Sequence, residues 1–149
     1  MSVQRFMAAE DEAWRGLCAE FDRVPIARFE EPTVTPEGWS AKDAMFHVAG
    51  WMADCAHQLE RMRAGSFDPT EESRESIERQ TQAWLELSRT MTPVDVRSAF
   101  ADSRRRMCEA FGDLQELTPD AIEWFGESGA LHYAAHAQHL RSWLGGDPA

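Results

Sequence analysis

The five histidines are the residues of this sequence best suited to chemistry. His132 and His136 are four residues apart in the segment LHYAAHAQHL. In a helix this spacing puts two side chains on one face with Cβ atoms ~5–6 Å apart, so both imidazoles can reach one cation. His47 lies in an apolar segment, and a third imidazole from a second helix would leave coordination positions open for water or substrate. The spacing therefore predicts a divalent-metal site formed by His47, His132 and His136.

Other interpretations of the histidines remain open at this point. HxxxH pairs also occur by chance on surface helices, and a lone residue such as His47 is more often a core histidine hydrogen-bonded to backbone or water. His139 lies one step further along the same helix face. It is either a further candidate ligand, a residue that contacts the ligands without binding the metal, or a solvated side chain. His57 lies off the face of His47 and is expected to be exposed. Three imidazoles with open positions suit zinc, nickel, iron or copper, so the residues do not select the metal.

The charge balance disfavours whole classes of partner. The formal net charge is −11, from 26 acidic and 15 basic residues. Such a surface repels nucleic-acid phosphates and anionic lipid, so neither nucleic acid nor membrane is expected as a partner. The only dense basic run, residues 104–106, lies in a helical pattern among acidic residues and is interpreted as a solvated face.

The cysteines and the N-terminus indicate a cytoplasmic protein. Cys18, Cys55 and Cys108 are odd in number, far apart and set in apolar stripes, which suits small core side chains in a reducing compartment. The first residues contain no apolar stretch of a signal peptide, and no segment approaches the ~18 consecutive apolar residues that a membrane span needs.

The rest of the sequence describes the helices that must position the histidines. Apolar residues recur at steps of three and four, and no segment alternates as a half-buried strand does. Helices are expected at residues 3–23, 40–65, 77–91, 93–114 and 128–144. Long amphipathic helices with short connections predict an all-α fold, an antiparallel four-helix bundle in which 77–91 is an additional or crossover helix. With no internal repeat and no linker, residues 1–149 are expected to form a single domain.

Local signals set the expected helix ends. Ser40 and Asp43 approximate a capping box at the start of the second helix, and Gly65 provides its stop. A threonine N-cap followed by proline occurs twice, at residues 92–93 and 118–119, and each pair predicts a helix start. Gly126 and Gly129 are expected to interrupt the short second of these elements before the last helix. The stripe of the first helix, which runs from Phe6 to Phe21, is broken once, by Glu10.

Two segments together resemble a known family. GWSAKDAMFHVAGW and LHYAAHAQHLRSWL are similar to the DinB-like/YfiT-like superfamily of four-helix-bundle metalloproteins, which includes the N-terminal domain of mycothiol-dependent maleylpyruvate isomerase. The family pattern is W-[ST]-x-x-[DE], then a metal-binding histidine and a tryptophan four residues later, with an HxxxH pair in the last helix. The residues that match this pattern are Trp39, Ser40, Asp43, His47, Trp51, His132 and His136.

The resemblance implies a function as well as a fold. It implies a divalent-metal-dependent hydrolase, or an S-transferase that uses a low-molecular-weight thiol such as mycothiol or bacillithiol, acting on a small-molecule substrate, and it implies a homodimer. Two other hypotheses remain: a non-catalytic bundle that binds or sequesters a small molecule, and an interaction protein with structural histidines. The motifs HExxH, GxxxxGK[ST], GxGxxG and GxSxG are absent, which disfavours helical zinc proteases, phosphate-loop proteins and serine hydrolases.

Supporting roles near the metal are weaker predictions. Glu123, Glu127 and Asp54 are candidates for a general base, although each is more readily explained as a capping or solvated carboxylate. Asp43 could orient His47, but its position predicts helix capping instead. Tyr133 is expected in the core, facing away from the histidine pair. Of the tryptophans, Trp39 and Trp51 flank His47 and are the two expected to form a pocket wall, while Trp84, Trp124 and Trp143 are assigned to the core.

Overall fold

The computed structural model describes residues 2–32 and 34–145. Within these ranges the chain forms helices and no strand, which confirms the predicted all-α class. The elements are α1 (Val3–Asp22), η1 (Ile26–Arg28), α2 (Ala41–Ala64), α3 (Arg74–Thr90), α4 (Pro93–Gly112), α5 (Pro119–Ser128) and α6 (Ala130–Trp143). None of these helices combines the length and the hydropathy that crossing a bilayer would require.

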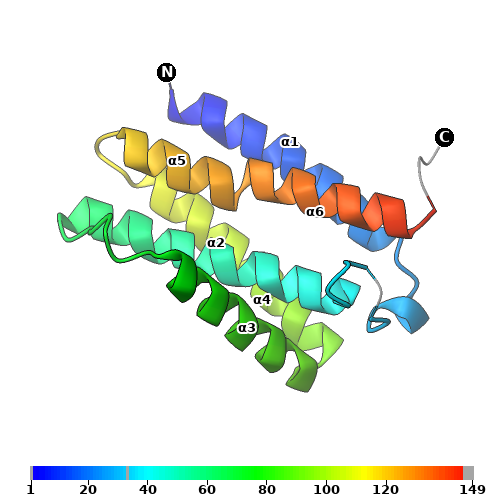
Figure 1. Cartoon of the computed structure of the whole chain (residues 1–149). Helices are drawn as coiled ribbons and strands as arrows, with labels where there is room; N and C mark the ends of the chain where they lie inside the picture. Colours follow the sequence, from blue (N-terminus) through cyan, green and yellow to red (C-terminus); the bar gives the residue numbers. More distant parts are fainter. Residues whose placement is uncertain (1, 33, 146–149) are drawn as a thin grey trace.

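Four columns of helix form the bundle: α1, α2, α4 and the nearly collinear pair α5–α6 (Figure 1). The α2 helix packs against α4, α1 packs against α6, and α3 lies outside the bundle against α2. The chain reverses direction at each end of α3, so α2 and α4 run the same way and α1 and α6 run the opposite way (Figure 1). The predicted bundle with a crossover helix is therefore confirmed, and α3 is the crossover.

The predicted capping signals act as expected at three helix starts. Ser40 and Asp43 form a complete capping box in which each side chain accepts from the other residue's backbone N–H. Thr92 and Thr118 cap α4 and α5, each followed by a proline at the first helical position. Gly65 ends α2 in the left-handed conformation, with φ 77°, which glycine adopts without a steric penalty.

The boundary between α5 and α6 differs from the prediction. Gly126 lies inside α5 and does not interrupt it, and Ser128 is the last residue of α5 rather than the start of the last helix. The break is at Gly129, where an added Cβ would lie only 2.6 Å from the carbonyl oxygen of Phe125. This glycine lets the two helices follow each other closely and sets the rotation of α6 relative to α5.

The core is apolar but contains a buried charged group. Glu10 is 1% exposed, and its carboxylate accepts from Nε of Arg104 at 3.0 Å and from the hydroxyl of Tyr133 at 2.8 Å. Tyr133 is fully buried, as predicted, and burial together with Glu10 raises its pKa. The prediction that residues 104–106 form a solvated face is wrong for Arg104. Arg105 and Arg106 are solvated, whereas Arg104 joins α4 to α1 and α6 through Glu10.

Gly50 lets α3 approach α2 closely. A Cβ at this buried glycine would lie 2.5 Å from two ring atoms of Trp84. We expect Gly50→Ala to lower the free energy of unfolding by up to ~2 kcal/mol, because an overpacking cost of ~1–3 kcal/mol is only partly offset by a gain in helix propensity of ~1 kcal/mol. Urea unfolding measures the change. The matched control is Gly16→Ala, at an exposed α1 position with nothing within 4 Å, which should be stabilising. Equal effects of the two changes would contradict the close α2–α3 contact.

Candidate metal centre

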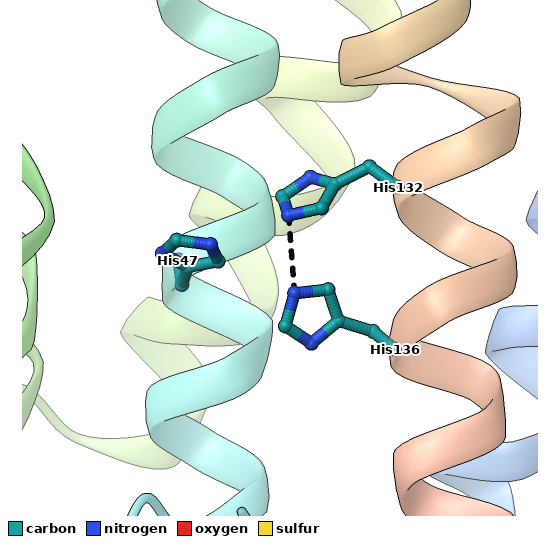
Figure 2. Close-up of side chains that lie close together, drawn as sticks. All are labelled: His47, His132 and His136. Atoms are coloured by element: carbon teal, nitrogen blue, oxygen red, sulfur yellow. Dashed lines mark hydrogen bonds between the residues drawn. The ribbon is translucent and has the colours of Figure 1, made fainter. Parts of the chain in front are cut away.

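Three histidines converge between α2 and α6. Figure 2 shows His132 and His136 one above the other on α6, both directed towards α2, which carries His47. One ring nitrogen from each of the three lies within 4.8 Å of the other two, and Nε2 of His132 is 3.0 Å from Nε2 of His136. The ring centroid of His47 is 5.0 Å from that of His132 and 5.2 Å from that of His136. The structure thus brings together the three predicted residues.

Burial keeps all three imidazoles neutral near pH 7. Desolvation lowers the pKa of His47 to about 3, with a smaller contribution from His132, and lowers the pKa of His132 to about 4. His136 is 6% exposed, and burial followed by repulsion from the neighbouring histidines places its pKa well below the ordinary value. A neutral imidazole offers a nitrogen lone pair, which is the form that binds a metal.

The hydrogen bonding of the cluster is incomplete. Nδ1 of His47, His132 and His136 is buried and has no partner within the described residues. The single contact between two of the rings joins Nε2 to Nε2, so one of these nitrogens donates and its neighbour accepts. Buried polar groups without partners are unusual in proteins. A set of three neutral imidazole donors with unsatisfied nitrogens fits a divalent transition-metal ion with open coordination positions.

The other two histidines do not join the cluster. His57 is exposed on α2, as predicted. His139 is exposed on α6, with its ring centroid 5.6 Å from that of His136, so it borders the cluster without belonging to the group of converging nitrogens. Of the alternatives left open for His139, the structure therefore supports a solvated side chain next to the cluster.

Tryptophans hold His47 from two sides. The ring of Trp39 lies 4.7 Å from that of His47, and Trp84 from α3 approaches the same imidazole at 6.4 Å. Trp84 also packs edge-on against Trp51 at 5.1 Å. Trp84 was assigned to the core from its helical spacing; it is half-buried, packs against the core and also contacts His47.

A cavity of about 580 Å³ opens beside the cluster. His47 and His132 line its inner end, while α5 and the segment before α3 form its sides. Trp51 lines the cavity as predicted, whereas Trp39 contacts His47 without lining it. The volume lies within the ~300–1,000 Å³ range of small-molecule sites.

The candidate carboxylates divide into two groups. Glu123 and Glu127 line the cavity that His47 and His132 also line, whereas Asp54 is not among its lining residues. Asp43 does not contact the cluster: its carboxylate accepts from the backbone N–H of Ser40 at 3.0 Å and from the hydroxyl of Ser88 at 2.6 Å. The predicted capping role of Asp43 is therefore confirmed.

The chain's own thiols are unreactive. Cys55 is fully buried, and Cys18 and Cys108 are half-buried against the core, in agreement with the prediction. Burial raises the pKa of Cys18 to about 11 and those of Cys55 and Cys108 to about 12. Near pH 7 these groups are thiols rather than thiolates, so they do not act as nucleophiles.

The sequence reasoning missed part of the cavity wall. Trp124, assigned to the core, lines the cavity with Asp120, Glu123 and Glu127. These four residues lie at positions i, i+3, i+4 and i+7 of α5, which share one face of a helix. Their spacing was visible in the sequence, but the side of the bundle that this face meets was not.

The comparisons with known proteins establish the fold. No family model matches the sequence, and no curated protein matches it significantly. Solved structures do match. The structure of an uncharacterised protein from Escherichia coli UTI89 has a TM-score of 0.78 at 12% identity, and the match covers 95% of this chain and 92% of the E. coli chain. The structure titled Sibling Lethal Factor Precursor - DfsB has a TM-score of 0.78 at 14% identity, covering 96% and 95%.

A third match has a biochemical name. Mycothiol-dependent maleylpyruvate isomerase has a TM-score of 0.76 at 18% identity, and the match covers 94% of this chain and 61% of the isomerase chain. Identities this low support similarity of fold alone. The chain therefore has a helical-bundle fold similar to that of mycothiol-dependent maleylpyruvate isomerase, with a three-histidine cluster between two of its helices.

Proposed function

We propose that this protein is a divalent-metal-dependent enzyme that acts on a small molecule at His47, His132 and His136, as a hydrolase or a thiol S-transferase. The observation that carries the proposal is the convergence of three largely buried, neutral imidazoles beside a ligand-sized cavity, which His47 and His132 line. The structure positions these nitrogens from two helices that are remote in sequence, and chance pairs on a helix surface do not produce such convergence.

His47, His132 and His136 would hold a divalent ion without neutralising its charge, and such an ion would supply activation of a water or thiol and polarisation of a substrate oxygen. The protein's own residues supply the remaining functions. Trp39 and Trp84 restrict the ring of His47. Glu123 and Glu127, on the wall of the same cavity, provide carboxylates able to accept a proton from an attacking nucleophile.

Two observations support the thiol-transfer branch. The chain's own cysteines remain protonated because their pKa values are raised, so a thiol nucleophile has to come from a separate molecule. The fold is similar to that of an enzyme named as mycothiol-dependent. Hydrolysis needs no such cosubstrate, so dependence of turnover on added thiol separates the two branches.

The test is metal content by elemental mass spectrometry on protein purified without a histidine tag. We expect near-stoichiometric divalent metal in the parent and at least ~10–100-fold weaker retention when His136 is replaced by Gln. The matched control is His57→Gln, which removes an exposed histidine outside the cluster and should leave metal content unchanged.

Turnover completes the test. Metal-loaded parent is screened against ester, amide and electrophilic small molecules, with and without a low-molecular-weight thiol, beside the His136→Gln variant. Metal-dependent product formation supports the enzyme. Stoichiometric ligand binding without product indicates the non-catalytic binding bundle, and a parent that takes up neither zinc, nickel nor iron contradicts the metal site itself.

A further inference from the structure

The cavity beside the histidine cluster has a one-sided charge. Six carboxylates line it, and no lysine or arginine is among its lining residues in the described parts of the chain. The six are Asp68, Glu71, Glu72, Asp120, Glu123 and Glu127. A divalent ion at the histidines would offset only two of these six negative charges. Clefts lined by one sign of charge concentrate counter-ions of the opposite sign.

The carboxylates come from two separate segments of the chain. Asp120, Glu123 and Glu127 occupy one face of α5, and the others lie in the segment 68–72 that precedes α3. All six are exposed, so they form the rim of the cavity, and they are called the rim carboxylates below.

Little of this charge is compensated within the protein. Arg61 pairs with Glu71 at 3.0 Å. Glu72, Glu123 and Glu127 form no ion pair within the described residues. The pKa of Glu72 is raised by burial and then by repulsion from Asp54 and Glu127, which shows that negative groups crowd this region. Side chains held near like charges are stabilised when a cation binds between them.

The deeper walls are apolar and aromatic. Trp51 and Trp124 line the cavity together with Phe67 and Ile77. Tryptophan faces attract cations by ~0.5–2 kcal/mol, and they also bury the apolar part of a ligand. At the inner end, His47 and His132 line the cavity, and the buried Nδ1 of each lacks a partner within the described residues. The cavity thus offers negative charge at its rim, aromatic surface in its walls and polar nitrogens at its base.

This inference rests on the function proposed above. We propose that the substrate is a small cation that carries an ammonium or guanidinium group on an apolar body, and that its reacting polar group is directed to the histidine cluster. The rim carboxylates hold the positive group, and Trp51 and Trp124 contact the body. The same charges repel carboxylate and phosphate substrates. The site therefore selects ligands by charge before any chemistry takes place.

Binding of two matched probes tests this inference without relying on turnover. Phenethyltrimethylammonium and phenethylsulfonate share one aromatic body and differ in charge, and neither a quaternary ammonium nor a sulfonate is a strong metal ligand. Isothermal titration calorimetry at fixed ionic strength gives both affinities. We expect the cation to bind at least ~10-fold more tightly than the anion, and we expect added salt to reduce the difference.

The variant Glu123→Gln/Glu127→Gln removes two exposed rim charges and should weaken cation binding by ~5–10-fold. The control Glu12→Gln/Glu86→Gln makes the same change in net charge at exposed positions outside the cavity and should leave binding unchanged. Equal binding of the two probes, no cation binding, or equal effects of the two double variants would overturn the inference.

Metal content measured on the same preparations separates this inference from the proposed function. Bound metal without a preference for the cation overturns the cationic substrate and leaves the metal enzyme standing. A clear preference for the cation in protein that takes up no metal supports the charge selection and contradicts the metal-dependent function.

Discussion

Replacing Glu10 with Ala is expected to lower the free energy of unfolding by ~3–5 kcal/mol, because removing one partner of a buried ion pair leaves the other charge uncompensated. Glu10 is 1% exposed, whereas Arg104 is 25% exposed and keeps a contact with Asp11 at 3.2 Å. This residual contact places the expected loss near the lower end of the range. The hydroxyl of Tyr133 would retain only Sδ of Met52, at 3.1 Å. Urea unfolding followed by circular dichroism measures the change.

Two further variants show that the loss comes from the buried pair. Glu10→Gln keeps an acceptor for Tyr133 and removes the charge, so its loss should be smaller, ~1–2 kcal/mol. Asp102→Asn breaks an exposed pair with Arg105 on α4, and we expect its effect to stay within ~0.5 kcal/mol. If Glu10→Ala and Asp102→Asn had equal effects, the Glu10–Arg104–Tyr133 network would not hold α1, α4 and α6 together.

Acid is expected to destabilise the metal-free protein through the histidine cluster. The folded-state pKa values of about 3 for His47 and about 4 for His132 lie below the unfolded value of ~6.5, so the unfolded chain binds more protons as the pH falls. The stabilisation is fully present above pH ~6.5 and is lost as the pH falls below it. At pH 5 the loss is roughly 2 kcal/mol for each of these histidines, and His136 acts in the same direction.

Differences between variants isolate this effect from other titrating groups. Chelator-treated parent and its His47→Gln variant are unfolded in urea at a series of pH values. The variant should lose less stability between pH 7.5 and 5, by about 2 kcal/mol. Burial raises the pKa of Asp54, which acts in the opposite direction but is common to both proteins and cancels. Parallel pH profiles for the parent and the variant would contradict burial of a neutral His47.

Local signals in the sequence were enough to predict most helix ends and half of the cluster. The capping box of Ser40 and the threonine–proline starts at 92–93 and 118–119 act through neighbouring residues, so the structure reproduces them. The pairing of His132 with His136 follows from helical geometry alone. The sequence linked His47 to this pair only through its position in an apolar segment and a family resemblance, because its convergence with them depends on the packing of α2 beside α6.

Where local signals compete, the tertiary structure decided the outcome. Gly126 and Gly129 have the same conformational freedom, yet the helix breaks only at Gly129. The break requires glycine at this position, because a side chain there would meet the carbonyl of Phe125. From the sequence, Glu10 was interpreted as an interruption of the apolar stripe of the first helix, and Arg104 as part of a solvated face. Their burial follows from the contact between α1 and α4, whose residues are more than 90 positions apart in the chain.

The cavity is the clearest case of a feature that no local pattern contains. Its walls come from α2, α3, α5, α6 and the segment before α3, and the collinear arrangement of α5 and α6 places Glu123 and Glu127 on the same cavity as His132. The sequence by itself determined the helices, their caps and the candidate histidines, because these depend on interactions within a few turns. Only the tertiary structure decided which helix faces meet, because that choice depends on packing between segments far apart in the chain.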